Sequence, residues 1–197
     1  APTKHLGSLG SGGACVTADG VLAERMRKLA GYGQDRARHR AIGGTPPPLH
    51  HETEGMNERM DEIQAAVLRV KLPDVPAGLA ARRRQAAFYG DALRRCVDVP
   101  AEQPGTRHAW RNYVVHLDDR DAVRARLAAR GIATSLSYAP PMHLQPVYAD
   151  KGQGPGSFPV SERSGERLLG LPIGPHLEKA ELEAVAAALC AEARPTT

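Results

Sequence analysis

Apolar residues recur at helical spacing along several stretches of the chain and predict its main helices. In the first stretch the repeat covers residues 21–29, and Gly31 and Gly33 follow it as a stop signal. The same spacing of three or four residues returns in later parts of the sequence. We expect further helices over residues 57–72, 79–95, 122–130, 161–169 and 179–193.

Short apolar runs predict strands at residues 14–17, 113–117 and 132–137. Asp118 and Asp119 are expected to cap the helix between the last two strands, and Gly131 is expected to end it. A strand, a helix and a second strand in this order are typical of a βαβ unit. Residues 34–55 and 138–160 show no clear periodicity and are predicted to be exposed loops.

These elements indicate an α/β chain with a boundary at residues 73–78. The sequence PDVPAG interrupts the helical pattern there, because Pro and Gly disfavour a continuous helix. The chain therefore divides into residues 1–72 and 73–197. The second part is expected to form a core that includes Val114, Val115, Leu117, Leu127, Ile132, Leu168, Leu169, Leu182, Val185 and Leu189.

The composition is that of an ordinary globular protein. Apolar residues make up 42% and charged residues 24% of the chain, close to the average of soluble domains. No apolar run is long enough for a transmembrane helix, and the first residues lack the layout of a signal peptide. The 3 cysteines have no C-x-x-C spacing, so we expect no disulfide framework, no zinc site and a reducing cytoplasm.

The net charge of +4 and the pI of about 9.2 raise the question of a nucleic-acid partner. Aromatic residues make up only 4% of the chain, too few for a stacking platform, and no helix-turn-helix or zinc-finger pattern occurs. A solvated, arginine-rich surface is therefore favoured over nucleic-acid binding. His50 and His51 have no third ligand at a useful spacing, so no metal site is expected.

Lys4 is the candidate for covalent chemistry. It precedes a glycine-rich stretch, whereas the lysine of a phosphate-binding P-loop follows its glycines. A lysine in a tight loop can act as a Schiff-base nucleophile if desolvation or a neighbouring cation keeps its amine neutral. An exposed terminal lysine without a chemical role is the alternative.

Several long segments, in a fixed order, carry a family resemblance. The first is APTKHLGSLGSGGACVTADGVLAERMRKLAGYGQ (1–34), in which a lysine is followed by a Gly-Gly-Ala run and a helix beginning LAER. The others are GMNERMDEIQAAVLRVKL (55–72), RGIATSLSYAPPMHLQPVY (130–148) and FPVSERSGERLLGLPIGPHL (158–177). Together they resemble the DegT/DnrJ/StrS family of sugar aminotransferases, and the resemblance spans nearly the whole chain.

This resemblance implies the C-terminal portion of the fold-type I, aspartate aminotransferase-like fold, whose enzymes use pyridoxal 5'-phosphate (PLP). Lys4 would hold the cofactor covalently and would later move a proton between the substrate carbon and the cofactor. An amino group would pass to a keto-sugar, usually nucleotide-linked, with glutamate as the common donor. The resemblance also implies a homodimer with its active site at the interface.

Further positions match residues that the family uses at this site. Asn57 matches an asparagine that reaches the cofactor phosphate of the partner subunit, and a helix N-cap is its simpler interpretation. Tyr138 and His143 match positions on the loop near the sugar substrate. A histidine bonded to local backbone is the alternative for His143. Arg59 is expected to pair with acidic neighbours.

Full members of the family are much longer than this chain, so it is expected to be their C-terminal part. Residues 1–72 would be the C-terminal remnant of the large PLP-binding domain, and residues 73–197 the small α/β domain. Little activity is expected of the chain alone, because the carboxylate that pairs with the pyridine nitrogen would be missing. The alternative is a catalytically inactive interaction or regulatory domain derived from this family. A sugar dehydratase is disfavoured, because histidine replaces the lysine there.

Overall fold

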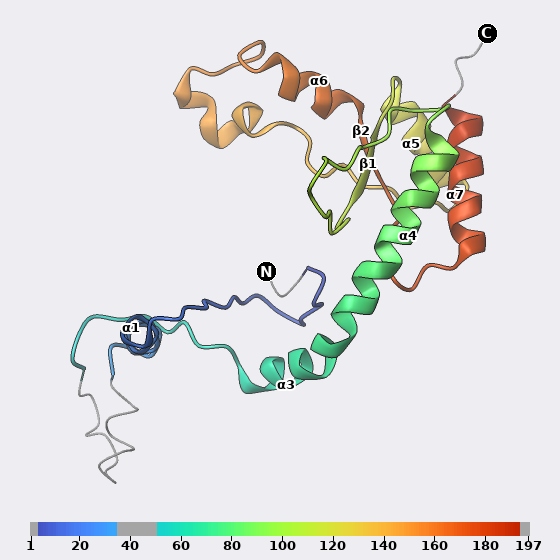
Figure 1. Cartoon of the computed structure of the whole chain (residues 1–197). Helices are drawn as coiled ribbons and strands as arrows, with labels where there is room; N and C mark the ends of the chain where they lie inside the picture. The colour runs from blue at the N-terminus through green and yellow to red at the C-terminus, as the bar shows by residue number, and fades with distance from the viewer. Residues whose placement is uncertain (1–3, 35–50, 194–197) are drawn as a thin grey trace. The chain divides into compact units, whose positions relative to one another are not determined.

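The computed structural model describes residues 4–34 and 51–193 (Figure 1). Its contacts divide the chain into two compact units, Ala1–Pro73 and Asp74–Thr197. The division falls at the start of the stretch 73–78. The assignment of these parts to a large and a small enzyme domain stays a prediction.

Helix α1 (Gly20–Ala30) in the first unit confirms the first predicted helix. The Oδ1 atom of Asp19 accepts hydrogen bonds from the backbone N–H groups of Val21 and Leu22, at 2.9 and 3.1 Å. These bonds satisfy donors that the start of a helix leaves without an intrahelical partner. Gly31 is the C-cap residue, so the predicted stop signal is also confirmed.

Helix α3 (Glu62–Lys71) begins later than predicted, directly after Asp61. A short 3-10 turn, η1 (Leu72–Asp74), follows it. Leu68 is the buried residue of α3, whereas Ile63 and Val70 on the same helix are 80% and 76% exposed. The apolar repeat that predicted this helix is therefore largely exposed.

The predicted strand at residues 14–17 is wrong. These residues have no regular structure, because no described residue pairs with them to form a ladder. An isolated antiparallel bridge instead joins Gly31 to Asn57. The N–H of Met56 also donates to the carbonyl of Leu29 at 2.8 Å. The end of α1 is thereby tied to the segment that leads into α3.

The helices of the second unit follow the predicted pattern with shifted ends. They are α4 (Val75–Leu93), α5 (Arg120–Ala129), α6 (Pro159–Arg167) and α7 (Lys179–Glu192). Helix α7 packs against α4 and α5 (Figure 1). Helix α4 begins inside the stretch that was expected to be non-helical. It does so because its proline lies in the first turn, where a missing N–H removes no helical hydrogen bond.

The predicted cap of α5 is only partly right. Asp119 is the N-cap residue, but its side chain makes no capping hydrogen bond and its φ is +50°. The carboxylate of Asp118 instead accepts a hydrogen bond from Nε of Arg167 at 2.9 Å. At the other end Gly131 has a φ of +75°, in agreement with its predicted role as the stop.

The sheet is a two-stranded antiparallel pair, β1 (Tyr113–His116) and β2 (Leu168–Leu171). The register runs from Tyr113 opposite Leu171 to His116 opposite Leu168. The predicted βαβ unit is therefore wrong. Residues 132–137 contribute only an isolated antiparallel bridge between Ser135 and Gly170.

The first two residues of β2, Leu168 and Leu169, were expected to be the end of the predicted helix 161–169. All residues of β2 are buried, so its sequence, LLGL, has no alternation of apolar and polar positions. Without alternation a short apolar run does not distinguish a buried strand from a helix end.

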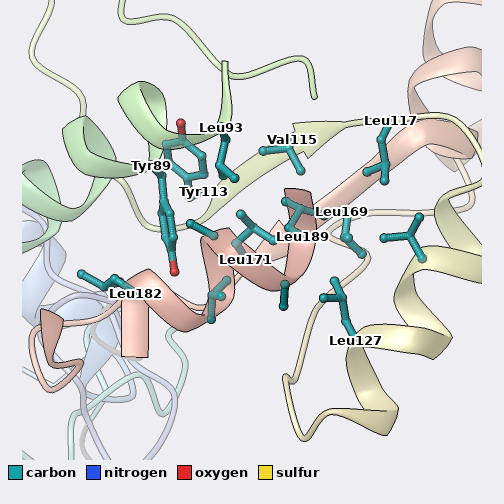
Figure 2. Close-up of a cluster of buried hydrophobic side chains, with 14 of the residues drawn as sticks. Tyr89, Leu93, Tyr113, Val115, Leu117, Leu127, Leu169, Leu171, Leu182 and Leu189 are labelled. Carbon is teal, nitrogen blue, oxygen red and sulfur yellow. The ribbon is translucent and has the colours of Figure 1, made fainter. Parts of the chain in front are cut away.

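The core of the second unit lies between the sheet and helices α4, α5 and α7 (Figure 2). Of the predicted core residues, Val114 and Ile132 are only partly buried, and the others are buried. The core also contains residues that were not predicted, namely Tyr89, Leu93, Trp110 and Tyr113. Tyr89 and Tyr113 are less than 2% exposed and are the largest fully buried side chains.

A disulfide joins Cys96 and Cys190 and corrects the expectation that the chain has none. Their Cα atoms are 5.2 Å apart across a sequence separation of 94 residues. The pairing was not predictable from spacing, because α4 and α7 bring the two residues together only in the folded unit. Cys15 is a free, exposed cysteine. Within the described residues no helix is both long and apolar enough to cross a membrane.

Candidate functional site

Lys4 lies at the start of a tight turn in the first unit. The N–H of Gly7 donates to the carbonyl of Lys4 at 3.2 Å. Gly7 has a φ of +69°, a conformation that favours glycine. The side chain of Lys4 is exposed, and its Nζ makes no hydrogen bond or ion pair with any described residue. The turn therefore presents an accessible primary amine.

Asn57 lies in the same unit, between the end of α1 and the start of α3. Its Oδ1 accepts a hydrogen bond from Nε of Arg59 at 3.2 Å. This bond occupies the amide oxygen and leaves the Nδ2 hydrogens available for donation. The interpretation of Asn57 as a helix N-cap is wrong, because Asp61 is the N-cap residue of α3.

Arg59 does not make the contacts that were expected of it. Its guanidinium carbon lies 5.4 Å from the ring centroid of Tyr32, in cation–π contact, and its Nε bonds to Asn57. No ion pair of Arg59 with a described acidic residue is present. Arg59 therefore orients the amide of Asn57 instead of neutralising a carboxylate.

Lys4 and Asn57 carry groups of the kinds that bind the two ends of PLP, its aldehyde and its phosphate. Its aldehyde reacts with a primary amine, which Lys4 supplies. Its phosphate accepts hydrogen bonds, and the Nδ2 group of Asn57 is a donor of the kind that a phosphate accepts from.

The second unit contains an open pocket of about 1020 Å³, between β1, α6 and the segment 137–158. Apolar side chains such as Val114, Met142 and Phe158 form part of its wall. Polar groups of Tyr138, His143, Tyr148, Lys151, Ser161 and Ser164 also line it. A mixed wall with several hydroxyl groups suits a polar ligand that has an apolar face.

Tyr138 and His143 both line this pocket but have different environments. Tyr138 is 77% exposed. The side chain of His143 is only 8% exposed, and its Nε2 lies 2.9 Å from Oε1 of Glu162. The ring of His143 also meets Phe158 edge-on, with centroids 4.8 Å apart. The alternative of a histidine bonded to local backbone is therefore wrong, because its partner is a carboxylate on α6.

Glu162 is a residue near this pocket that the sequence analysis missed. Its carboxylate accepts hydrogen bonds from the N–H of Gly156, at 2.8 Å, and the N–H of Phe158, at 3.0 Å, besides its contact with His143. These bonds, led by that from Gly156, lower the pKa of Glu162 below its usual value. An acidic residue near the start of the predicted helix 161–169 was the available signal.

No group of described residues could hold a metal ion. His51 was discussed together with His50 as a possible metal ligand. Its Nδ1 lies 2.6 Å from the carbonyl oxygen of Tyr32. His50 lies outside the described residues.

Comparison with known sequences identifies one family along almost the entire chain. Residues 1–190 match the DegT/DnrJ/EryC1/StrS aminotransferase family. The match includes both units, and it contains the positions of Lys4, Asn57, Tyr138 and His143.

Individual relatives agree with this match. The chain is 41% identical over 194 residues to the erythromycin biosynthesis sensory transduction protein EryC1 of Saccharopolyspora erythraea, covering 98% of this chain and 50% of that protein. It is 41% identical over 180 residues to the dTDP-3-amino-3,4,6-trideoxy-alpha-D-glucose transaminase of Streptomyces venezuelae, covering 90% of this chain and 45% of that protein. The chain thus spans about half the length of the curated relatives it matches.

A solved structure shows the same relationship. The crystal structure of S. venezuelae DesV in complex with a ketimine intermediate matches with a TM-score of 0.84 and 39% sequence identity. The match covers 100% of this chain and 50% of that one. The mixed α/β architecture described above therefore corresponds to half of a known aminotransferase chain.

Proposed function

Because the chain belongs to the DegT/DnrJ/EryC1/StrS aminotransferase family, we propose that it carries the cofactor lysine of a PLP-dependent sugar aminotransferase. The proposed reaction moves an amino group, with glutamate as donor, to a nucleotide-linked keto-sugar. The observation that carries the proposal is the position of Lys4, on a glycine-rich turn inside the region that matches the family. The name of the S. venezuelae relative, a transaminase of a dTDP-linked amino sugar, supports the substrate class.

Lys4 has two proposed tasks. Its Nζ would hold the cofactor covalently, and once released the neutral amine would carry a proton between the substrate carbon and the cofactor. PLP, when bound, supplies the electron sink for this chemistry. Neither task can be taken over by a permanently charged group, because a protonated amine is neither a nucleophile nor a base.

Asn57 is the proposed phosphate ligand. Its Nδ2 is oriented by the bond from Arg59 to Oδ1 and can donate a hydrogen bond without adding a charge. We assign this donation to the cofactor of the other subunit in a homodimer.

Tyr138 and His143 are the proposed substrate-side residues. The exposed hydroxyl of Tyr138 can donate to or accept from a sugar hydroxyl. His143 lines the same pocket as Tyr138 and is held by the carboxylate of Glu162 on α6.

The two units have different proposed origins. Residues 1–72 belong to the large PLP-binding domain, and residues 73–197 form the small domain. The separation of the chain into two compact units supports this assignment, as does the match to half of the DesV chain.

The amino-donor half-reaction tests this function. The 197-residue chain is incubated with PLP and then with glutamate, and 2-oxoglutarate is measured together with the visible spectrum. Because little activity is expected of the chain alone, we expect a slow release of 2-oxoglutarate, and none above background from Lys4→Ala. Lys179→Ala is the matched control, because this lysine is 84% exposed on α7 in the other unit. A product yield unaffected by Lys4→Ala would contradict the proposal.

A second candidate is a catalytically inactive regulatory domain of the same family. The name of the S. erythraea relative, a sensory transduction protein, favours it. The same half-reaction separates the two functions, since a regulatory domain needs no Lys4-dependent product.

A further inference from the structure

The glycine-rich segment that follows Lys4 has no regular secondary structure, yet side chains from α3 hold it at two points. Nζ of Lys71 donates to the carbonyl of Gly7 at 2.6 Å. Nε2 of Gln64 donates to the carbonyl of Ser11 at 2.7 Å. Both donors belong to the first unit, so the contacts are internal to it.

The spacing of the two donors matches the segment they hold. Gln64 and Lys71 are seven residues apart on α3, which places them on one face of the helix about 10.5 Å apart along its axis. Gly7 and Ser11 are four residues apart, and four residues span at most about 13 Å when extended. The segment therefore runs along α3 in the opposite chain direction, with each donor facing one carbonyl.

The glycines of the segment permit this close approach. A Cβ atom at Gly7 would lie 3.2 Å from Nζ of Lys71, and one at Gly10 would lie 2.9 Å from Oε1 of Gln64. The second distance is too short for a real Cβ contact. With a larger residue at position 10, the amide of Gln64 would have to move away from the position in which it donates to Ser11.

The contacts reach Lys4 through the backbone. The N–H of Gly7 donates to the carbonyl of Lys4, and the carbonyl of Gly7 accepts from Lys71. Since Nζ of Lys4 has no side-chain partner among the described residues, the position of its amine depends on its backbone. A charged donor on a backbone carbonyl is among the stronger hydrogen bonds available for this purpose.

We propose that Gln64 and Lys71 are positioning residues that clamp the segment 7–11 onto α3 and thereby fix the turn from which Lys4 presents its amine. The inference rests on the proposed function, because positioning Lys4 matters only if its amine binds the cofactor. Neither residue touches the reacting atoms.

The test combines hydrogen exchange with covalent trapping. The variants are Gln64→Met and Lys71→Met, which keep side-chain length and helix propensity but remove the donors. Arg69→Met is the matched control, since Arg69 is an exposed cation in the same helical turn with no contact to the segment. Circular dichroism verifies that α3 is retained in each variant. Amide exchange is measured by mass spectrometry over residues 5–12, and the rate of borohydride trapping of PLP at Lys4 by peptide mapping.

We expect exchange of the Gly7 amide, whose N–H donates to the carbonyl of Lys4, to rise about tenfold in each clamp variant, and trapping at Lys4 to slow by a similar factor. Arg69→Met should change neither quantity. Unchanged amide exchange in both Gln64→Met and Lys71→Met would overturn the proposal that these residues clamp the segment, whether or not PLP forms an adduct with Lys4. Faster exchange with unchanged trapping at Lys4 would overturn its positioning role. An unaltered chain that forms no Lys4 adduct would instead contradict the proposed function, and the exchange data would still decide the clamp.

Discussion

His143 and Glu162 are joined by a contact of 2.9 Å between Nε2 and Oε1, across a separation of nineteen residues. The same carboxylate accepts the backbone N–H groups of Gly156 and Phe158. One side chain of α6 therefore holds both ends of the segment that forms the rim of the large pocket. Because His143 lines that pocket, the carboxylate directly holds one of the proposed substrate-side residues.

Replacing Glu162 by Gln should destabilise the chain in a pH-dependent manner. Hydrogen bonds from Gly156, Phe158 and His143 lower the pKa of Glu162 below its usual 4.5. A carboxylate with a lowered folded-state pKa contributes stability above the unfolded pKa, and this stability is lost as the pH falls through the folded pKa. Urea unfolding should therefore show a larger difference between the unaltered chain and Glu162→Gln at pH 7 than at about pH 3.

Glu166→Gln is the matched control for this comparison, because Glu166 lies exposed on the same helix. Its effect should be small at both pH values. An equal loss of stability for Glu162→Gln at both pH values would show that the ionised carboxylate is not what holds the segment.

The buried pair Tyr89 and Tyr113 predicts opposite effects of the same substitution. Their rings pack with centroids 5.2 Å apart (Figure 2). The hydroxyl of Tyr89 donates to the carbonyl of Pro172 at 2.9 Å, whereas the buried hydroxyl of Tyr113 has no partner among the described residues. Burial raises the pKa of Tyr113 to about 12.

Tyr89→Phe should lower the free energy of unfolding by about 1 kcal/mol, because it leaves a carbonyl unpaired. Tyr113→Phe should be neutral or raise it by up to about 1 kcal/mol, because it removes an unsatisfied polar group from the core. Urea titration of the two variants measures both changes. A loss for Tyr113→Phe equal to that for Tyr89→Phe would mean that the Tyr113 hydroxyl is hydrogen-bonded in solution.

The disulfide predicts that reductant destabilises the second unit. Closing a loop with a sequence separation of 94 residues restricts the unfolded chain, and such a crosslink contributes about 2–4 kcal/mol. Dithiothreitol should lower the Tm of the unaltered chain and of Cys15→Ser. It should not affect the double variant Cys96→Ser, Cys190→Ser. Alkylation of all 3 cysteines in the unfolded, unreduced chain would contradict the crosslink.

The elements that could be predicted are those with one apolar and one polar face, because only these show a periodic pattern in the sequence. Helix α1 was recognisable because its apolar repeat is followed by Gly31 and Gly33 as a stop signal, whereas the capping role of Asp19 was not predicted. The buried strand β2 has no polar face and therefore no periodicity. The pairing of Cys96 with Cys190 depends on how α4 and α7 pack, which spacing in the sequence does not encode.

The residues of the candidate site also fall into those that the sequence indicated and those that it did not. Lys4 stood out by its place before a glycine-rich stretch, and the family resemblance assigned Asn57, Tyr138 and His143. Glu162 was missed because its role depends on backbone groups of a loop that carries no pattern. The donors Gln64 and Lys71 were missed for the same reason, since their acceptors are carbonyls and not side chains.

Peptide mapping after borohydride reduction of the chain with PLP tests the proposed role of Lys4 most directly. Reduction converts the covalent bond between cofactor and amine into a stable pyridoxyl label. The proposed function predicts a label on Lys4 that is absent from Lys4→Ala. No label on Lys4 would contradict it, as would labelling spread equally over the other lysines, Lys28, Lys71, Lys151 and Lys179.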